Sequence, residues 1–203
     1  MRTITSTLTI LLFFAGSFCL LISCQKGSGN NNPVNQKPRV GSKWVYRYST
    51  YHAYGGLINS YNITYRATAM ETLGGEEWLK IVDTATGTAV FYLKEKSDGL
   101  YQYINNNSYL MCKYPAAVND TYAGHTGTVA ADYLVRNLNE MQAFGVIGDL
   151  TLTYYEGLLG TETVDKLWYN ARVWLAQRYI YIKPPLGSNY YRSASLIIQD
   201  FIY

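Results

Sequence analysis

The chain has 203 residues, a formal net charge of +3 and 21 tyrosines among its aromatic side chains. Its basic residues are scattered rather than clustered, which excludes the electrostatic footprint of a nucleic-acid-binding protein. Tyrosine, tryptophan, threonine and valine suit the half-buried surface of a sheet, so the composition favours β structure.

The first residues have the layout of an export signal. An apolar run over residues 8–22 follows a lone Arg2, as in secretory leaders. The run is shorter than the roughly 20 residues that a membrane-spanning helix needs, which argues against a retained helical anchor. Its end, Leu21-Ile22-Ser23-Cys24, resembles the lipobox of bacterial lipoproteins. The resemblance implies cleavage before Cys24 and acylation of that cysteine, and two or more acyl chains anchor a protein stably in a membrane.

We therefore expect three parts: a lipoprotein signal peptide (1–23), a flexible tether (24–38) and a single β domain (39–203). The tether is rich in Gly, Asn, Ser and Gln, and such a composition buries too little apolar surface to order itself. If Cys24 is acylated, Cys112 is the one cysteine of the domain. Without a disulfide partner, Cys112 is expected to be a small buried apolar residue.

Alternating polar and apolar residues predict strands along the domain. In the first of them Trp44, Tyr46 and Tyr48 share one face, because successive side chains of a strand point to opposite sides. The pair Asp98-Gly99 predicts a type I′ turn between two strands, since both central residues of that turn need positive φ. The strands expected after the first lie at 63–69, 78–82, 91–96, 100–104 and 109–114.

The second half continues in the same way, with turn signals every 8 to 12 residues, a spacing typical of antiparallel sheets. Residues 132–144 allow two interpretations. They read as a helix with Asp132 as N-cap and Gly145 as its stop, or as a strand that ends in a turn at Asn139-Glu140. The strand is favoured because its neighbours are strands. The later strands are expected at 150–155, 166–169, 173–182 and 195–203.

Two segments resemble small secreted bacterial lipoproteins of unknown function. Residues 40–46 resemble their G-x-x-W-x-Y start, and residues 167–175 resemble their W-Y-A-x-G-V-G-L-V segment, with Arg172 and Trp174 where glycines usually stand. The resemblance implies an all-β, antiparallel meander that forms a strongly curved sheet, a half-barrel or an open barrel, with at most one short helix. It brings no catalytic residue with it.

The sequence shows no motif for catalysis, a metal or a phosphate. His52 and His125 have no nearby His, Cys or paired carboxylate in the sequence. Glu76 and Glu77 are adjacent on a predicted strand, so their side chains point to opposite faces and cannot form a glycosidase dyad. We therefore expect no enzyme, no catalytic residue, no metal and no cofactor.

The aromatic residues have three interpretations: core and cross-strand pairs, a ligand surface, or the girdles of a transmembrane barrel. Lysine and arginine within the predicted strands argue against the last of these. We expect a membrane-anchored, non-enzymatic binding or assembly module with an apolar ligand on its concave face, where Trp44, Tyr46 and Tyr48 are the candidate lining. The alternative is a glycan-binding accessory lipoprotein.

The expected location is the cell envelope, and the expected partner is the membrane through acylated Cys24, together with a lipid, a glycan or another envelope protein. The residue after Cys24 is Gln25 and not an aspartate. In this respect the chain resembles lipoproteins that are sent to the outer membrane. Whether the domain faces the periplasm or the cell surface stays open.

Overall fold

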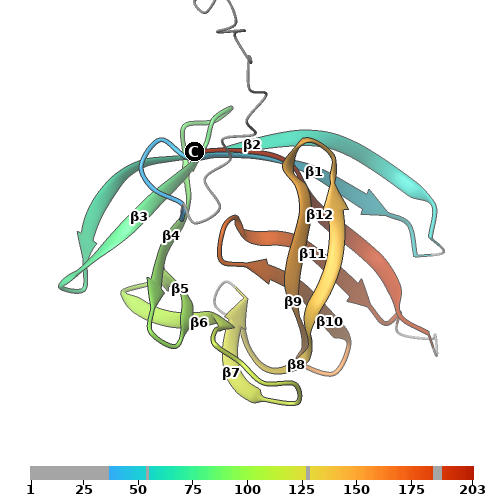
Figure 1. Cartoon of the computed structure of the whole chain (residues 1–203). Helices are drawn as coiled ribbons and strands as arrows, with labels where there is room; N and C mark the ends of the chain where they lie inside the picture. Colours follow the sequence, from blue (N-terminus) through green and yellow to red (C-terminus); the bar gives the residue numbers. More distant parts are fainter. Residues whose placement is uncertain (1–36, 54, 127–128, 185–188) are drawn as a thin grey trace, which may run out of the picture. The chain divides into compact units, whose positions relative to one another are not determined.

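The computed structural model describes residues 37–53, 55–126, 129–184 and 189–203. The predicted leader, Cys24 and all but the end of the predicted tether lie outside the described residues. The described part forms a single sheet of 12 antiparallel strands (Figure 1). The predicted all-β, antiparallel class is confirmed, and the helical structure in the described ranges is a 3₁₀ turn, η1 (Gly145–Ile147).

Almost every strand pairs with its neighbours in the chain. The exceptions are β6 and β7, which are not paired with each other and form the two edges. The first strand pairs with the last, and the order along the sheet is β6-β5-β4-β3-β2-β1-β12-β11-β10-β9-β8-β7. The strands are β1 (Lys43–Tyr51), β2 (Leu57–Leu73), β3 (Glu76–Asp83), β4 (Ala89–Lys96), β5 (Gly99–Ile104), β6 (Asn107–Lys113), β7 (Thr121–Thr126), β8 (Val129–Phe144), β9 (Gly148–Leu159), β10 (Thr163–Asn170), β11 (Trp174–Ile182) and β12 (Tyr191–Ile202).

The segment that allowed two interpretations is a strand, since β8 runs through residues 132–144. The prediction of a turn at Asn139-Glu140 is wrong, because β8 continues through both residues. Instead, the register against β9 shifts between Val135 and Asn137 and again between Asn137 and Glu140. Such irregularities bend a strand without ending it, which is why a turn-like pair of polar residues sits inside a long hairpin.

The hairpin between β4 and β5 is confirmed, but the predicted turn type is wrong. Lys96 pairs with Gly99, so the turn residues are Ser97 and Asp98, and neither has positive φ. Gly99 is needed for a different reason, because a Cβ there would collide with the carbonyl oxygen of Cys112. Two consecutive residues of positive φ, as in a type I′ turn, occur instead at Asn105 and Asn106, with φ of 51° and 62°.

The two edge strands, β6 and β7, follow one another in the chain and meet at a seam that carries no ladder of paired strands. Side chains join the edges there. The hydroxyl of Tyr122 donates to the carbonyl of Met111 (2.9 Å), and that of Tyr155 donates to the carbonyl of Lys113 (2.6 Å). The amide of Gln102 donates to the carbonyl of His125 (2.9 Å). The sheet is therefore nearly closed and barrel-like, with one seam.

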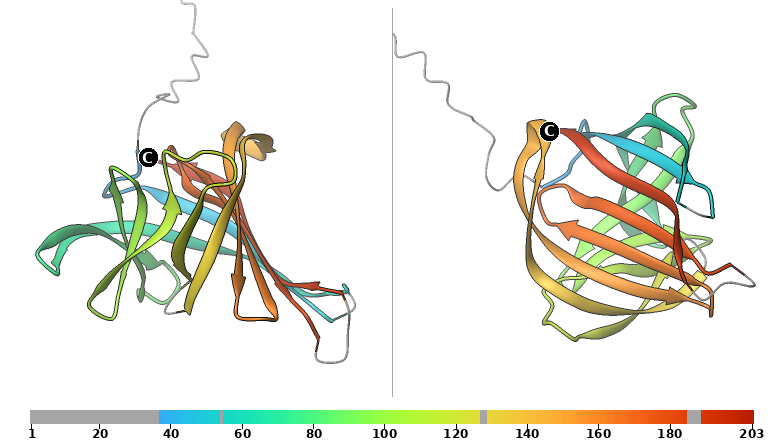
Figure 2. Two further views of the ribbon diagram at one scale, coloured as in Figure 1. Left: turned by 90° about the horizontal axis from the view of Figure 1, so that it is seen from below. Right: turned by 90° about the vertical axis from the view of Figure 1, so that its right-hand side faces the viewer.

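The core lies on the inner face of this sheet. Trp44, opposite Phe201 of β12 and Tyr65 of β2, is 2 % exposed. Cys112 is fully buried, as predicted, and it is a free cysteine. The long β8–β9 hairpin extends beyond β10, and its η1 tip packs against β12 (Figure 2).

Candidate ligand-binding site

The first strand is tied to the β10–β11 turn on the inner face. The indole nitrogen of Trp44 donates to the carbonyl of Val173 (2.9 Å), and the hydroxyl of Tyr46 donates to the carbonyl of Leu175 (2.6 Å). Each pair is separated by 129 residues in the chain. The two sequence segments that carry the resemblance, residues 40–46 and 167–175, are thus in direct contact. This contact holds the β10–β11 turn against β1.

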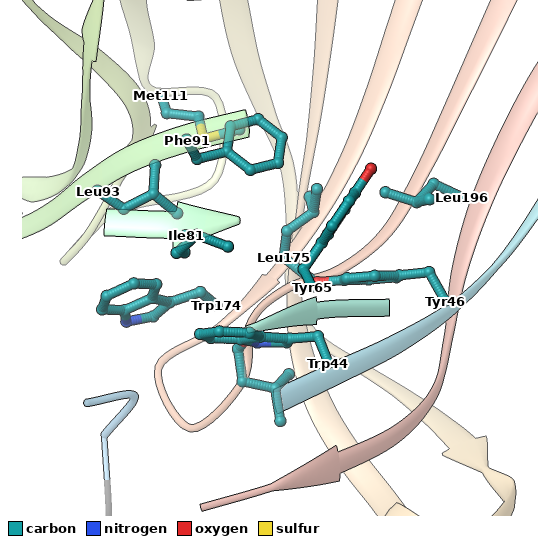
Figure 3. Close-up of a pocket in the computed structure, with 11 residues that line it drawn as sticks. Trp44, Tyr46, Tyr65, Ile81, Phe91, Leu93, Met111, Trp174, Leu175 and Leu196 are labelled. Atoms are coloured by element: carbon teal, nitrogen blue, oxygen red, sulfur yellow. The ribbon is translucent and has the colours of Figure 1, made fainter. Parts of the chain in front are cut away.

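Aromatic and aliphatic side chains converge around this contact and enclose a narrow cavity of about 30 Å³, which we call the waist (Figure 3). The ring of Trp44 stacks on that of Trp174, with centroids 6.2 Å apart, and tilts against Phe201 at 5.4 Å. Further lining residues of the waist are Tyr46, Tyr65, Ile81, Phe91, Leu93 and Leu196.

A second pocket adjoins the waist on the inner face. This inner pocket has a volume of about 160 Å³ and shares Tyr65, Phe91 and Leu196 with the waist. Tyr48 and Arg178 complete its lining together with Ile180, Ala194 and Ser195. Its wall is therefore mainly apolar, with one guanidinium.

A third pocket adjoins the waist where it shares Leu93 and Trp174. We call it the mouth; its volume is about 590 Å³ and it carries charged side chains at its rim. These are Lys37, Arg39, Glu77, Lys94 and Glu95. Mouth and inner pocket thus each share lining residues with the waist, which has the smallest volume of the three.

Trp174 lies where the mouth meets the waist and has two unusual properties. Its backbone has a φ of +63°, a conformation that is rare for a bulky residue. Its side chain is 5 % exposed, yet the indole nitrogen has no hydrogen-bond partner within the described part of the chain. Most buried donors are paired in folded proteins, so this nitrogen is an exception, a buried donor without an acceptor on a residue that lines both the mouth and the waist.

Beyond the inner pocket the interior contains an ion pair. Arg178 donates from Nε and Nη2 to the two carboxylate oxygens of Asp165, at 2.9 and 3.0 Å, and the hydroxyl of Tyr133 donates to the same carboxylate at 2.7 Å. Asp165 is fully buried. Burial opposes the charge of Arg178, but the neighbouring carboxylate outweighs it and raises the pKa of the guanidinium. The guanidinium of Arg178 therefore keeps its positive charge beside Asp165.

Other polar groups of the interior are held in their uncharged forms. Burial raises the pKa of the Tyr46 hydroxyl and of the Cys112 thiol well above their usual ranges. A nucleophilic thiol needs a lowered pKa, so Cys112 has the opposite of that property. The arrangement supplies apolar contact and hydrogen bonds from uncharged groups.

The two histidines lie apart from this region. His52 is exposed at the end of β1, and the ring of His125 lies against Tyr109 at the seam, with centroids 4.0 Å apart. Within the described ranges, no three His, Cys, Asp or Glu side chains gather where they are able to hold a metal ion. The same ranges contain no helix with the length and apolarity to cross a membrane.

The structure places all three predicted site residues on the inner face. Trp44 and Tyr46 line the waist, and Tyr48 lines the inner pocket. Sequence reasoning missed Trp174 and Arg178, which come from β11. One signal was available for Trp174, because it stands where the segment that residues 167–175 resemble usually has a glycine. Nothing in the local sequence pattern indicated Arg178.

Comparison with protein-family models, with curated proteins and with solved structures gives no match to this chain.

Proposed function

We propose that the protein is a lipid-anchored, non-enzymatic binding module of the cell envelope that holds an apolar chain inside its curved sheet. The observation that carries this proposal is the series of mouth, waist and inner pocket, which share lining residues and are mainly apolar. Ligand sites are typically concave and apolar with a few placed polar groups. Here the polar groups are Trp174 at the waist and Arg178 at the inner pocket.

The dimensions favour an unbranched alkyl chain. The waist of about 30 Å³ has room for about two water molecules, so it admits a few methylene groups and is too small for a fused ring system. Each buried methylene contributes about 0.8 kcal/mol. A chain that runs from the mouth through the waist therefore gains affinity with each carbon that it places inside.

The anchor follows from the lipobox-like segment ending at Cys24. Acylation there would tether the domain to the outer membrane, next to the lipids that we propose as its ligands. Replacing Cys24 with Ser should abolish labelling by a radioactive fatty acid and leave the domain unanchored or uncleaved. Unchanged labelling would contradict the anchoring.

The binding function is tested by filling the inner pocket. Ala194 lines that pocket, so Ala194→Leu should reduce the space and weaken binding of diphenylhexatriene, an apolar fluorescent probe, about tenfold through overpacking. The matched control is Ala143→Leu, because Ala143 is exposed on the outer face. The mature chain with Cys24→Ser serves as the background, so that no acyl group competes with the probe.

Three results are informative. Probe binding that Ala194→Leu weakens and Ala143→Leu does not supports the proposal. Equal binding by both variants places the probe elsewhere and contradicts it, as does failure of the parent chain to bind. Native mass spectrometry of the acylated protein, extracted from membranes, should in addition detect a co-purified lipid.

A second candidate function is glycan binding on the outer face. A groove of about 370 Å³ lies between the β8–β9 tip and the outer face of β11 and β12. Three amide side chains and one tyrosine ring line it, and amides and aromatic rings suit sugar hydroxyls and sugar faces. These residues are Gln142, Gln177, Gln199 and Tyr179.

The same two variants test this candidate with their roles exchanged. Ala143 lines the outer groove, so Ala143→Leu should weaken retention on an oligosaccharide array while Ala194→Leu should not. An array without any signal for the parent chain would remove the candidate.

A further inference from the structure

We propose that the indole N–H of Trp174 is the donor that recognises the polar end of the ligand, and that the ligand is an acidic amphiphile with a single alkyl chain entering the waist. This inference rests on the proposed binding function and specifies the ligand class for the same pockets. The acidic end lies in the mouth, and its oxygen accepts a hydrogen bond from Trp174 Nε1.

The first support is the unpaired donor itself. Two of the four indoles have an acceptor: Trp44 donates to Val173 (2.9 Å) and Trp78 to Leu73 (3.0 Å). Trp174 Nε1 has no acceptor among the described residues, although its ring lines both the mouth and the waist. Trp168 Nε1 also lacks one, but its ring lies on the outer face against Tyr154 and lines none of the three pockets.

The second support is the backbone conformation. Left-handed φ at a bulky residue costs free energy and persists where the surroundings impose it, often at ligand-binding positions. The turn before Trp174 is held by Asn170, whose Oδ1 accepts from the amide of Arg172 (2.8 Å) and whose carbonyl accepts from that of Val173 (3.2 Å). A glycine would adopt this φ without strain. Trp174 instead places a large ring with a donor at the junction.

The third support is the charge at the mouth. Lys37 pairs with Glu95 at 2.6 Å, and Lys94 lies 3.4 Å from Glu76. Arg39 also lines the mouth and forms no ion pair with the side chains that the structure describes. A guanidinium without a carboxylate partner favours an anion nearby. The charged lining residues of the mouth are three cations and two carboxylates, Glu77 and Glu95, which leaves a net charge of +1. This charge, on the pocket that Trp174 also lines, agrees with a carboxylate or phosphate end and an alkyl tail that extends into the waist.

The experiment compares two fluorescent probes on the mature chain with Cys24→Ser. One is cis-parinaric acid, which has a carboxylate and an unbranched chain, and the other is diphenylhexatriene, which has no acceptor. Both are excited directly, so that removing a tryptophan does not alter the signal. Trp174→Phe keeps an aromatic ring and removes the N–H, and Trp168→Phe is the matched control at the other unpaired indole.

We expect Trp174→Phe to weaken binding of cis-parinaric acid about tenfold and to leave diphenylhexatriene within about twofold. Arg39→Gln should weaken the acid in the same selective way, and Trp168→Phe should change neither probe. Thermal unfolding of each variant verifies that it is folded.

Two failures are distinguishable. If the parent binds both probes and Trp174→Phe binds the acid as well as the parent does, the inference is wrong and the binding function stands. An equal loss of affinity for both probes in a folded Trp174→Phe variant also contradicts recognition by the N–H. Diphenylhexatriene has no acceptor, so its loss would come from altered ring packing and not from the missing N–H. If the parent binds neither probe, the proposed function itself fails.

Discussion

The hydroxyl of Tyr122 on β7 donates to the carbonyl of Met111 on β6, with the two oxygens 2.9 Å apart. This bond crosses the seam at which the two edges of the sheet meet. Unpaired edge strands invite association with other chains. Here tyrosine hydroxyls donate to carbonyls of the edge strand β6, so side chains bridge the seam although no ladder of backbone bonds joins its two edges.

Removing these hydroxyls should weaken the seam. Tyr122→Phe and Tyr155→Phe each leave a carbonyl of β6 without its donor, and we expect each to lower the free energy of unfolding by about 1–2 kcal/mol. Urea denaturation measures the change. Tyr190→Phe is the control, because Tyr190 makes a longer, exposed bond to Thr161 (3.4 Å). An equal effect at all three positions would contradict a special role of the seam.

The interior ion pair should show strong coupling. Asp165→Asn or Arg178→Met alone leaves an uncompensated buried charge and should cost about 3–5 kcal/mol. The double variant removes both charges and should be more stable than the sum of the single effects predicts. Denaturation of the four proteins gives the coupling energy. Additive losses would show that the two side chains act independently despite their bidentate contact.

Two glycines make room for the ring of Tyr133. A Cβ at Gly157, directly opposite on β9, would lie 2.5 Å from the ring, and one at Gly124 would lie 2.7 Å from it. We expect Gly157→Ala to cost about 1–3 kcal/mol through overpacking. Gly56→Ala is the control, because a Cβ there meets only His52 at 3.7 Å.

The converse test adds Gly157→Ala to a variant that lacks the ring of Tyr133. Tyr133→Ala is itself destabilising because it leaves a cavity, but adding Gly157→Ala to it should cost almost nothing further. A persistent cost of Gly157→Ala without the ring would mean that the backbone, and not Tyr133, requires the glycine.

Buried tyrosines should make the protein unfold at high pH. Burial raises the pKa of Tyr46, Tyr122, Tyr155 and Tyr169 above the usual value of about 10. A folded-state pKa above the unfolded one stabilises the fold fully below the unfolded pKa, and this contribution is lost as the pH rises above it. The stability should therefore fall from about pH 10 upward.

The tyrosinate absorbance measures this transition. In the native chain a fraction of the tyrosines should ionise late and together with the loss of circular dichroism, whereas in guanidinium chloride all should ionise near their usual pKa. Gradual ionisation of every tyrosine without unfolding would contradict the burial. Tyr101 lies outside the core and is more accessible. Partial burial and the neighbouring Asp98 raise its pKa to about 12.

The strands were predictable because their signal is local. Alternation in residues 44–48 identified which side chains of β1 share a face, and the structure places Trp44, Tyr46 and Tyr48 on the inner face. The strand β7 was not predicted. Its six residues include Gly124 and His125, and no clear alternation of apolar residues marks it.

The pockets were less predictable because distant residues build them. The bond between Trp44 and Val173 joins positions 129 residues apart, and no spacing pattern reports such a contact. The left-handed backbone of Trp174 was equally hidden, since φ is set by the turn around it rather than by tryptophan's own preference. Periodicity in the sequence identified Trp44, Tyr46 and Tyr48. The unpaired indole N–H of Trp174 was recognised only from the three-dimensional structure.

The pairing of β1 with β12 has a consequence for how the chain is made. Lys43 lies opposite Ile202, so β1 emerges from the ribosome before the other strands of the sheet and meets its second neighbour only after β12 has also been made. Until then β1 keeps one side of its backbone open, and contacts so distant in the chain form slowly. Loss of β12 (Tyr191–Ile202) would leave both β1 and β11 with an unpaired edge.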